Sequence, residues 1–109
     1  MIILRDDPVI EIFDSPHNPP NWIETIDIKN NEYRFCDDEG QRHVGVIIQP
    51  SSGVRLPPAL CDYELHPVGT PDVANAVALV DLAEAIEPNQ KFPNLAALRS
   101  YLLDRQNKT

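Results

Sequence analysis

The chain has 109 residues, 42% hydrophobic and 24% charged, which is enough apolar surface for one packed domain and excludes disorder along its whole length. Its net charge is −8, from 17 acidic and 9 basic residues, so its surface would repel nucleic-acid phosphates and anionic lipids. No stretch approaches the ~20 consecutive apolar residues of a membrane helix, and the start of the chain lacks the pattern of a secretory signal, so we expect a cytoplasmic protein.

The first part of the chain predicts two short strands. Residues 2–4 and 9–13 are apolar and rich in β-branched side chains, and residues 6–8 between them are typical of a turn. Residues 15–21 contain three prolines, which cannot donate hydrogen bonds to a strand ladder, so we expect an extended loop there.

A three-strand meander is predicted next. In residues 22–29 the side chains of Trp22, Ile26 and Ile28 alternate with polar ones, which favours a strand. Asn30 and Asn31 are suited to a tight turn into a second strand that carries Tyr33 and Phe35.

The acidic turn at residues 37–40 ends the second strand, with Gly40 at a position that suits a left-handed backbone. The third strand covers residues 43–49, in which Val44, Val46 and Ile48 share one face. A last strand is expected over residues 61–66, before Pro67. The links between strands are too short for helical crossovers, so we expect an antiparallel sheet.

Beyond residue 70 the hydrophobic period changes to that of helices. Thr70 is suited to an N-cap and Pro71 to the first helical position, and an apolar stripe continues until Pro88. A second amphipathic helix is expected from about residue 93 to 105, with a frayed tail at 106–109.

Residues 1–109 therefore predict a single α+β domain: residues 1–69 are mainly β, and residues 70–105 form two helices. We expect an antiparallel sheet of five to six strands with a meander core, covered by the two C-terminal helices.

Cysteine and histidine patterns do not favour a metal site. Cys61 and His66 form the closest pair, and an odd separation along a strand places them on opposite faces. We expect Cys36 and Cys61 to be buried and reduced, although the sequence leaves a disulfide between them open.

Catalytic signatures are equally weak. Cys36 and His43 could meet across the acidic turn, but nearby carboxylates would raise the pKa of the thiol, so we interpret Cys36 as structural. The four glycines are scattered and form no phosphate-binding loop. We therefore assign no catalytic residue, metal or cofactor.

Two features predict a contact surface. Trp22 follows the proline-rich loop that contains His17, and Asp37, Asp38 and Glu39 form an acidic turn that could steer a basic partner. The competing interpretation is that Trp22 is a core residue of the sheet.

The resulting hypothesis is a non-enzymatic module that binds another protein, in the manner of small inhibitors, immunity proteins and adaptors. One alternative is a small hydrolase or isomerase that uses His43 or His66 with a carboxylate between sheet and helices. Another is a homodimer formed through a sheet edge or a helix face.

Overall fold

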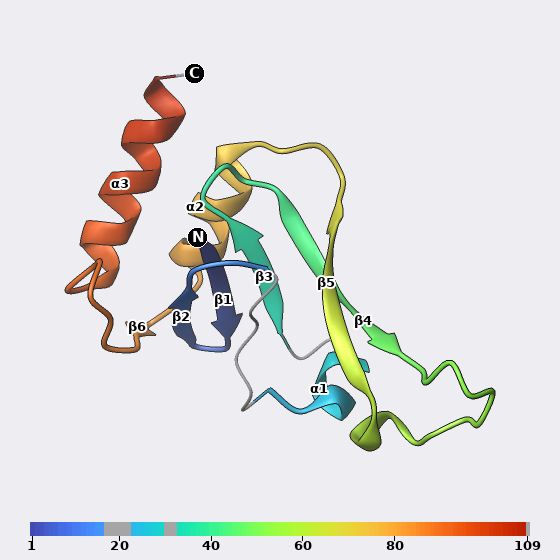
Figure 1. The fold of residues 1–109 in the computed structure, drawn as a ribbon. Coiled ribbons are helices and arrows are strands. Elements are labelled where there is room, and N and C mark those ends of the chain that lie inside the picture. The colour runs from blue at the N-terminus through green and yellow to red at the C-terminus, as the bar shows by residue number, and fades with distance from the viewer. Residues whose placement is uncertain (17–22, 30–32, 109) are drawn as a thin grey trace.

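The computed structural model describes residues 1–16, 23–29 and 33–108. The elements, in chain order, are β1 (Ile2–Asp6), β2 (Val9–Phe13), α1 (Thr25–Lys29), β3 (Arg34–Asp37), β4 (Arg42–Ile48), the short 3-10 helix η1 (Pro58–Leu60), β5 (Asp62–Val68), α2 (Val73–Asp81), β6 (Ala85–Ile86) and α3 (Leu95–Asn107). The strands form one sheet in the order β5-β4-β3-β1-β2-β6 (Figure 1). This arrangement confirms the predicted α+β class.

The central part of the sheet is built around β1. This strand pairs antiparallel with β2 on one side and with β3 on the other, and Leu4 lies opposite Glu11 and Phe35. Consecutive residues of a strand point to opposite faces, yet Ile2, Ile3 and Leu4 are all fully buried. Both faces of the sheet are therefore covered at its centre.

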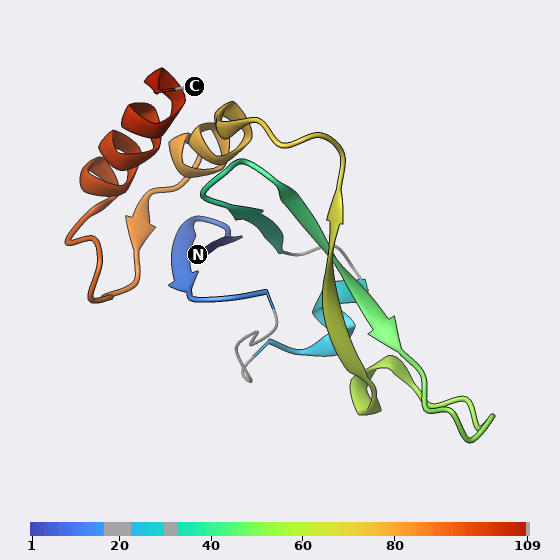
Figure 2. The same cartoon turned by 45° about the horizontal axis from the view of Figure 1, so that its top comes forward.

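One face, which we call the helical face, packs against the two C-terminal helices. Its core cluster consists of Ile3, Ile10, Cys36, Val73, Ala76, Val80, Leu98 and Leu102. Figure 2 shows α2 next to the sheet and α3 beside α2. The expected pair of covering helices is thus present.

The opposite face, which we call the α1 face, packs against α1 and the residues just before it. Its core cluster consists of Ile2, Leu4, Ile23, Ile28, Phe35 and Leu65. The predicted strand at residues 22–29 is wrong, because residues 25–29 of this segment form α1. Asp27 and Ile28 both donate backbone hydrogen bonds to the Glu24 carbonyl, and the Thr25 hydroxyl donates to the Cys61 carbonyl at 2.8 Å.

The burial of Ile23, just before α1, is also inconsistent with the predicted strand. Ile23 and Ile28 are both buried against the sheet, which a two-residue period cannot achieve across five positions. The meander therefore consists of β3, β4 and β5. The turn predicted at Asn30 and Asn31 lies outside the described residues.

The first C-terminal helix is shorter than predicted at both ends. Its N-cap is Asp72, whose side chain accepts from the Ala74 N–H at 3.0 Å, so the expected cap at Thr70 is wrong by two residues. The helix ends at Asp81 instead of continuing to Pro88. Helix α3 starts as expected, with Asn94 as its N-cap, and ends at Asn107.

The residues after Asp81 form β6, which the sequence did not predict. This strand pairs parallel with β2, and the Glu84 and Glu87 N–H groups donate to the Pro8 and Ile10 carbonyls at 2.7 and 2.9 Å. The sheet is therefore mixed instead of wholly antiparallel. Residues 85–86 form a strand instead of continuing the helix, because the edge of β2 offers hydrogen-bond partners for their backbone and Ile86 packs against the helical-face core.

The predicted acidic turn is confirmed. Gly40 connects β3 to β4 with a φ of 83°, and a Cβ at this position would overlap the Asp72 carbonyl. The Gly40 carbonyl in turn accepts from the Asp72 N–H and from the Asn75 side chain at 3.3 and 3.1 Å. The turn therefore joins the sheet to the start of α2.

Strands β4 and β5 extend away from the C-terminal helices as a long hairpin, which we call the arm (residues 42–68) (Figures 1 and 2). The molecule measures 48 × 27 × 21 Å, and its radius of gyration of 14.8 Å exceeds the roughly 13 Å typical of this length. Pro67 lies in β5, and a proline is tolerated there because β5 is an edge strand.

The contact between the arm and α1 can be tested at Gly45, where a Cβ would overlap Ile28 Cγ2. We predict that Gly45→Ala lowers the free energy of unfolding by about 1–3 kcal/mol, because the added methyl group overfills this contact. Urea denaturation followed by circular dichroism would measure the loss. In an Ile28→Ala background the same change should cost clearly less, and an equal cost in both backgrounds would contradict the packing of α1 on β4.

Candidate functional site

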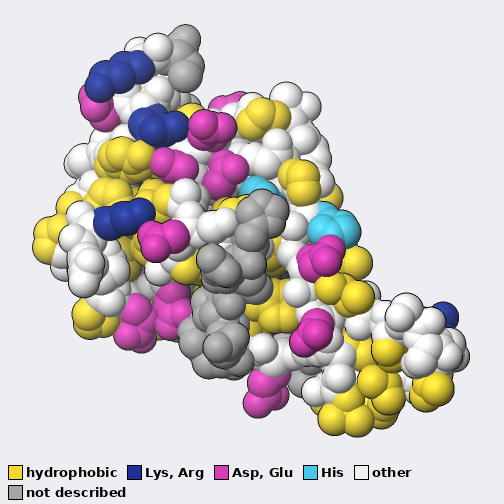
Figure 3. Space-filling view, viewed as in Figure 1, with side chains coloured by type: hydrophobic (Ala, Val, Ile, Leu, Met, Phe, Trp, Pro, Cys, Tyr) yellow, Lys and Arg dark blue, Asp and Glu magenta, His cyan; other side chains and the backbone are white. Residues whose placement is uncertain are grey.

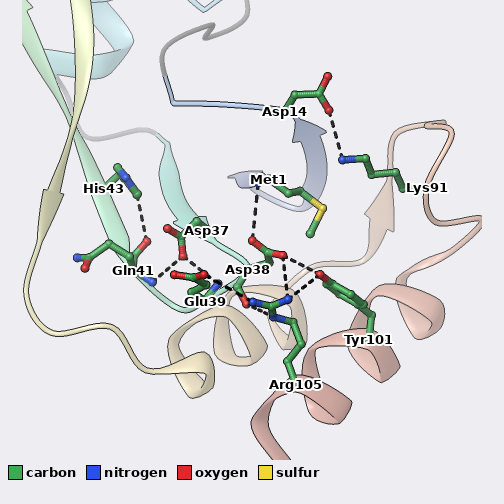
Figure 4. A network of polar contacts seen from close by, with 10 residues as sticks. All are labelled: Met1, Asp14, Asp37, Asp38, Glu39, Gln41, His43, Lys91, Tyr101 and Arg105. Carbon is green, nitrogen blue, oxygen red and sulfur yellow. Dashed lines mark hydrogen bonds and ion pairs between the residues drawn. The ribbon is translucent and has the colours of Figure 1, made fainter. Parts of the chain in front are cut away.

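The acidic turn between β3 and β4 is held by its own side chains. The Asp37 carboxylate accepts from the backbone N–H groups of Glu39 and Gln41, both at 2.9 Å (Figure 4). An Asp that binds the backbone two residues ahead is a common way to stabilise a turn. The Asp37 carboxylate therefore stabilises the backbone of this turn.

Asp38 points toward α3 and is engaged there. Its carboxylate accepts from the Tyr101 hydroxyl at 2.7 Å and lies 3.6 Å from Arg105 Nη1, while its backbone carbonyl accepts from Arg105 Nε at 3.0 Å (Figure 4). The Met1 amino group is 3.7 Å from the same carboxylate. With only 18% of its side chain exposed, Asp38 joins the turn to α3.

Glu39 is the most exposed of the three acids, at 73%, and lies 3.9 Å from Arg105 Nη2. The predicted contact residues thus fall into two groups: Asp37 and Asp38 have partners within the fold, and Glu39 faces solvent. His17 and Trp22 lie outside the described residues.

A pocket of about 330 Å³ lies at the root of the arm, where β3 and β4 separate. The two strands pair only at Phe35 with His43 and at Cys36 with Arg42. Arg34, Cys36, Arg42 and His43 line the pocket together with the α2 residues Asn75 and Leu79. Cys36 and His43 both line this pocket, but the predicted meeting of their side chains is wrong, because the register pairs His43 with Phe35 and Cys36 with Arg42, on opposite faces of the sheet.

The chemistry of this pair is unfavourable for nucleophilic catalysis. Burial, reinforced by the charge of Asp37, raises the pKa of the Cys36 thiol to about 12, and Arg42 opposes this shift only in part. The thiolate is therefore scarce at neutral pH. His43 Nδ1 lies 3.1 Å from the Gln41 carbonyl, to which it donates, and no carboxylate occurs among the described residues that line the pocket.

The other titratable groups are scattered over the described part of the chain. His66 pairs with Glu64 at 2.9 Å on β5, where both side chains are at least half exposed. Cys36 and Cys61 are both buried and unbridged, as predicted. No group of three His, Cys, Asp or Glu residues among the described positions could hold a metal ion.

A third feature is the exposed apolar surface of the arm. Of seven exposed large hydrophobic side chains in the described residues, six belong to it: Val44, Val46, Ile48, Val54, Leu60 and Val68. The first three alternate along β4 as predicted, but they point to the helical face at a place that the helices do not cover. Figure 3 shows further hydrophobic side chains over the loop at the far end of the arm.

Comparisons with protein-family models, curated proteins and solved structures found no significant match. Among the described helices, none is long and apolar enough to cross a bilayer. The geometry of the chain is therefore the basis for any functional proposal.

Sequence reasoning missed the arginines of the root pocket. Arg34 and Cys36 share a strand face by their spacing, and this signal was available in the sequence. What placed Arg42 beside them is the register across the acidic turn, which pairs Cys36 with Arg42.

The role of Asp38 can be tested by Asp38→Asn, which keeps the shape of the side chain and removes its charge. We predict a loss of about 1–3 kcal/mol in the free energy of unfolding, because Arg105 and Tyr101 lose an ionised partner. Glu39→Gln is the matched control and should cost less than about 0.5 kcal/mol, since Glu39 is largely solvated. Equal losses in the two variants, measured by urea denaturation, would contradict this assignment.

Burial of Cys36 and Tyr63 predicts a fall in stability at alkaline pH. Both pKa values are raised to about 12 in the folded chain, whereas the unfolded groups ionise near 8.5 and 10. The unfolded chain therefore loses these protons first, so the stabilisation is complete below about pH 8.5 and is lost as pH rises toward 12. Each group contributes a slope of at most about 1.4 kcal/mol per pH unit.

Cys36→Ala should flatten this fall between about pH 8.5 and 10, whereas Tyr63→Phe should change the profile only above about pH 10. Denaturation curves at fixed pH values would measure both effects. If Cys36→Ala instead lowers stability by the same amount at every pH, the thiol contributes only through packing. That result would contradict the prediction that ionisation of the buried thiol causes part of the alkaline fall in stability.

Proposed function

We propose that the chain is a non-enzymatic module that binds another protein through its arm. The observation that carries this proposal is the concentration of exposed apolar side chains, six of seven in the described residues, on residues 44–68. Contiguous apolar surface is uncommon on proteins that act alone, and it is typical of interaction sites.

Two parts of the arm support the contact in different ways. Val44, Val46 and Ile48 form an apolar strip along one face of β4, and each is between 37% and 43% exposed. Val54 and Leu60, beyond the end of that strand, are 60% and 69% exposed. Full burial of such a side chain contributes about 1.5–3 kcal/mol, so a partner that covers several of them would bind stably.

The charges beside the strip favour a basic partner. Asp62 and Glu64 lie opposite Ile48 and Val46 on β5, so they share the same face as the strip. The outer edge of β5 ends the sheet and can pair with an added strand. A segment with alternating apolar and basic side chains fits this surface, and the net charge of −8 would speed its approach.

The enzymatic alternative lacks support from the described geometry. A hydrolase or isomerase needs a histidine oriented by a carboxylate, and His43 donates to a backbone carbonyl instead. His66 has a carboxylate partner, but the pair lies on an exposed strand. A second copy of the chain is the other candidate occupant of the arm. As part of this proposal, we expect the protein to be cytoplasmic.

The proposal is tested by capturing partners from a lysate of the source cells with the wild-type chain and with a Val46→Thr, Ile48→Thr double variant. We expect a basic protein to be retained by the wild-type chain at low salt and at least tenfold less by the variant. Raising the salt concentration should weaken the capture further, because Asp62 and Glu64 are exposed.

Leu82→Thr is the matched control, since Leu82 is 67% exposed but lies outside the arm. It should retain the partner as the wild-type chain does, and all variants should show unchanged melting curves. Equal retention by the arm variant would contradict the proposal. A dimer in sedimentation equilibrium that the arm variant dissolves would replace the proposed partner by a second copy.

A further inference from the structure

The outer edge of β5 carries an inference that goes beyond the proposed partner. We infer that two copies of the chain associate through this edge, with the two β5 strands antiparallel and Leu65 of one copy opposite Leu65 of the other. The sheets of the two copies then form one continuous sheet. Such a symmetric contact uses the same surface on both copies, so each favourable interaction occurs twice.

Hydrogen bonds at the acidic turn identify the residues of β5 whose backbone faces this edge. The Asp37 N–H donates to the Gln41 carbonyl at 2.9 Å, and in an antiparallel ladder every second residue bonds to the same neighbour. The even-numbered residues of β4 therefore bond to the even-numbered residues of β5. Leu65 and Pro67 direct their backbone groups outward, which agrees with a proline that has no N–H to donate to β4. Within the described part of the chain no strand lies beyond β5, so Leu65 can exchange two hydrogen bonds with a second copy.

The side chains on either side of Leu65 are complementary to each other. Glu64 and His66 project from the same face of β5, 2.9 Å apart, and their side chains are 61% and 50% exposed. With Leu65 opposite Leu65, Glu64 of each copy lies directly opposite His66 of the other, at a position where side chains are about 4.5–5.5 Å apart. An imidazole carries at least one N–H, so it can donate to a carboxylate in either protonation state. The contact therefore joins each acid to a histidine of the other copy.

Neighbouring alignments of the two strands are less favourable. A shift by two residues in one direction places Glu64 opposite Glu64, and like charges directly opposite each other are destabilising. A shift by two residues in the other direction places His66 opposite His66 and Leu65 opposite Pro67. Since Pro67 has no N–H, that alignment loses the reciprocal hydrogen bonds at Leu65. The charges and the proline together favour the alignment centred on Leu65.

The paired arms leave the apolar strip exposed on both copies. Residues that lie opposite each other in an antiparallel pair point to the same face, so the two helical faces lie on one side of the continuous sheet. The two strips, each formed by Val44, Val46 and Ile48, are then separated by the two β5 strands. The added strand at the edge of β5 is that of the second copy, and the proposed partner binds the strips. The dimer therefore does not depend on that partner.

The test is sedimentation equilibrium of the full chain over a range of concentrations. The net charge of −8 opposes self-association at low ionic strength, so the measurement uses about 0.15 M salt, where the screening length is roughly 8 Å. We expect a reversible equilibrium between monomer and dimer. His66→Glu places carboxylates opposite each other and should weaken the dimer at least tenfold. Adding Glu64→Lys to His66→Glu restores opposite charges across the contact and should recover the dimer.

Gln90→Glu is the matched control, because it also adds one negative charge, at an exposed position outside the arm, and it should leave the dimer unchanged. The Val46→Thr, Ile48→Thr variant should still form the dimer, so the outcome is separate from that of the partner capture.

Amide hydrogen exchange gives a second measurement. The Leu65 N–H should exchange more slowly as the chain concentration rises, whereas the Glu64 N–H, which bonds to β4, should be protected at every concentration. The inference is overturned if the chain stays monomeric, if His66→Glu and Gln90→Glu have equal effects, or if the strip variant dissolves the dimer. It is also overturned if the exchange of the Leu65 N–H does not depend on concentration.

Discussion

Strand β1 is buried on both sides, and this requires a separate covering element for each face of the sheet. Ile3 points to α2 and α3, whereas Ile2 and Leu4 point to α1 and the residues before it. Strands β2 and β3 flank β1 and supply its backbone hydrogen-bond partners on both edges. The positions of all three helices follow from this one strand.

On the helical face, coverage of the sheet ends at the arm. Helix α2 has only nine residues, and it packs against β1 and β3. The apolar strip of β4 therefore faces solvent, and the pocket opens where α2 no longer covers β4. The acidic turn differs from the exposed strip, because the carboxylate of Asp38 forms an ion pair with Arg105 within the fold. In the described part of the chain, the exposed large apolar side chains thus lie almost entirely on the arm.

Local sequence signals were reliable where local interactions dominate. Gly40 adopts the left-handed backbone of its turn, and Asn94 caps α3 with its own side chain. Local sequence signals predicted the wrong structure where long-range contacts compete with a short hydrophobic pattern. The segment before Lys29 is helical because Thr25 and Ile28 find partners on the arm, and residues 85–86 form a strand because β2 has a free edge. Neither partner could be recognised from the segment alone.

The amino-acid sequence by itself determined the α+β class, the places of five of the six strands and of both C-terminal helices, and the acidic character of the chain, because hydrophobic period and charge are local properties. It also identified the alternation of Val44, Val46 and Ile48. Tertiary structure alone decided that this strip stays exposed and that Arg34 and Arg42 meet at one pocket. Burial and side-chain proximity depend on strand order and register, and these are set by contacts between residues far apart in the chain.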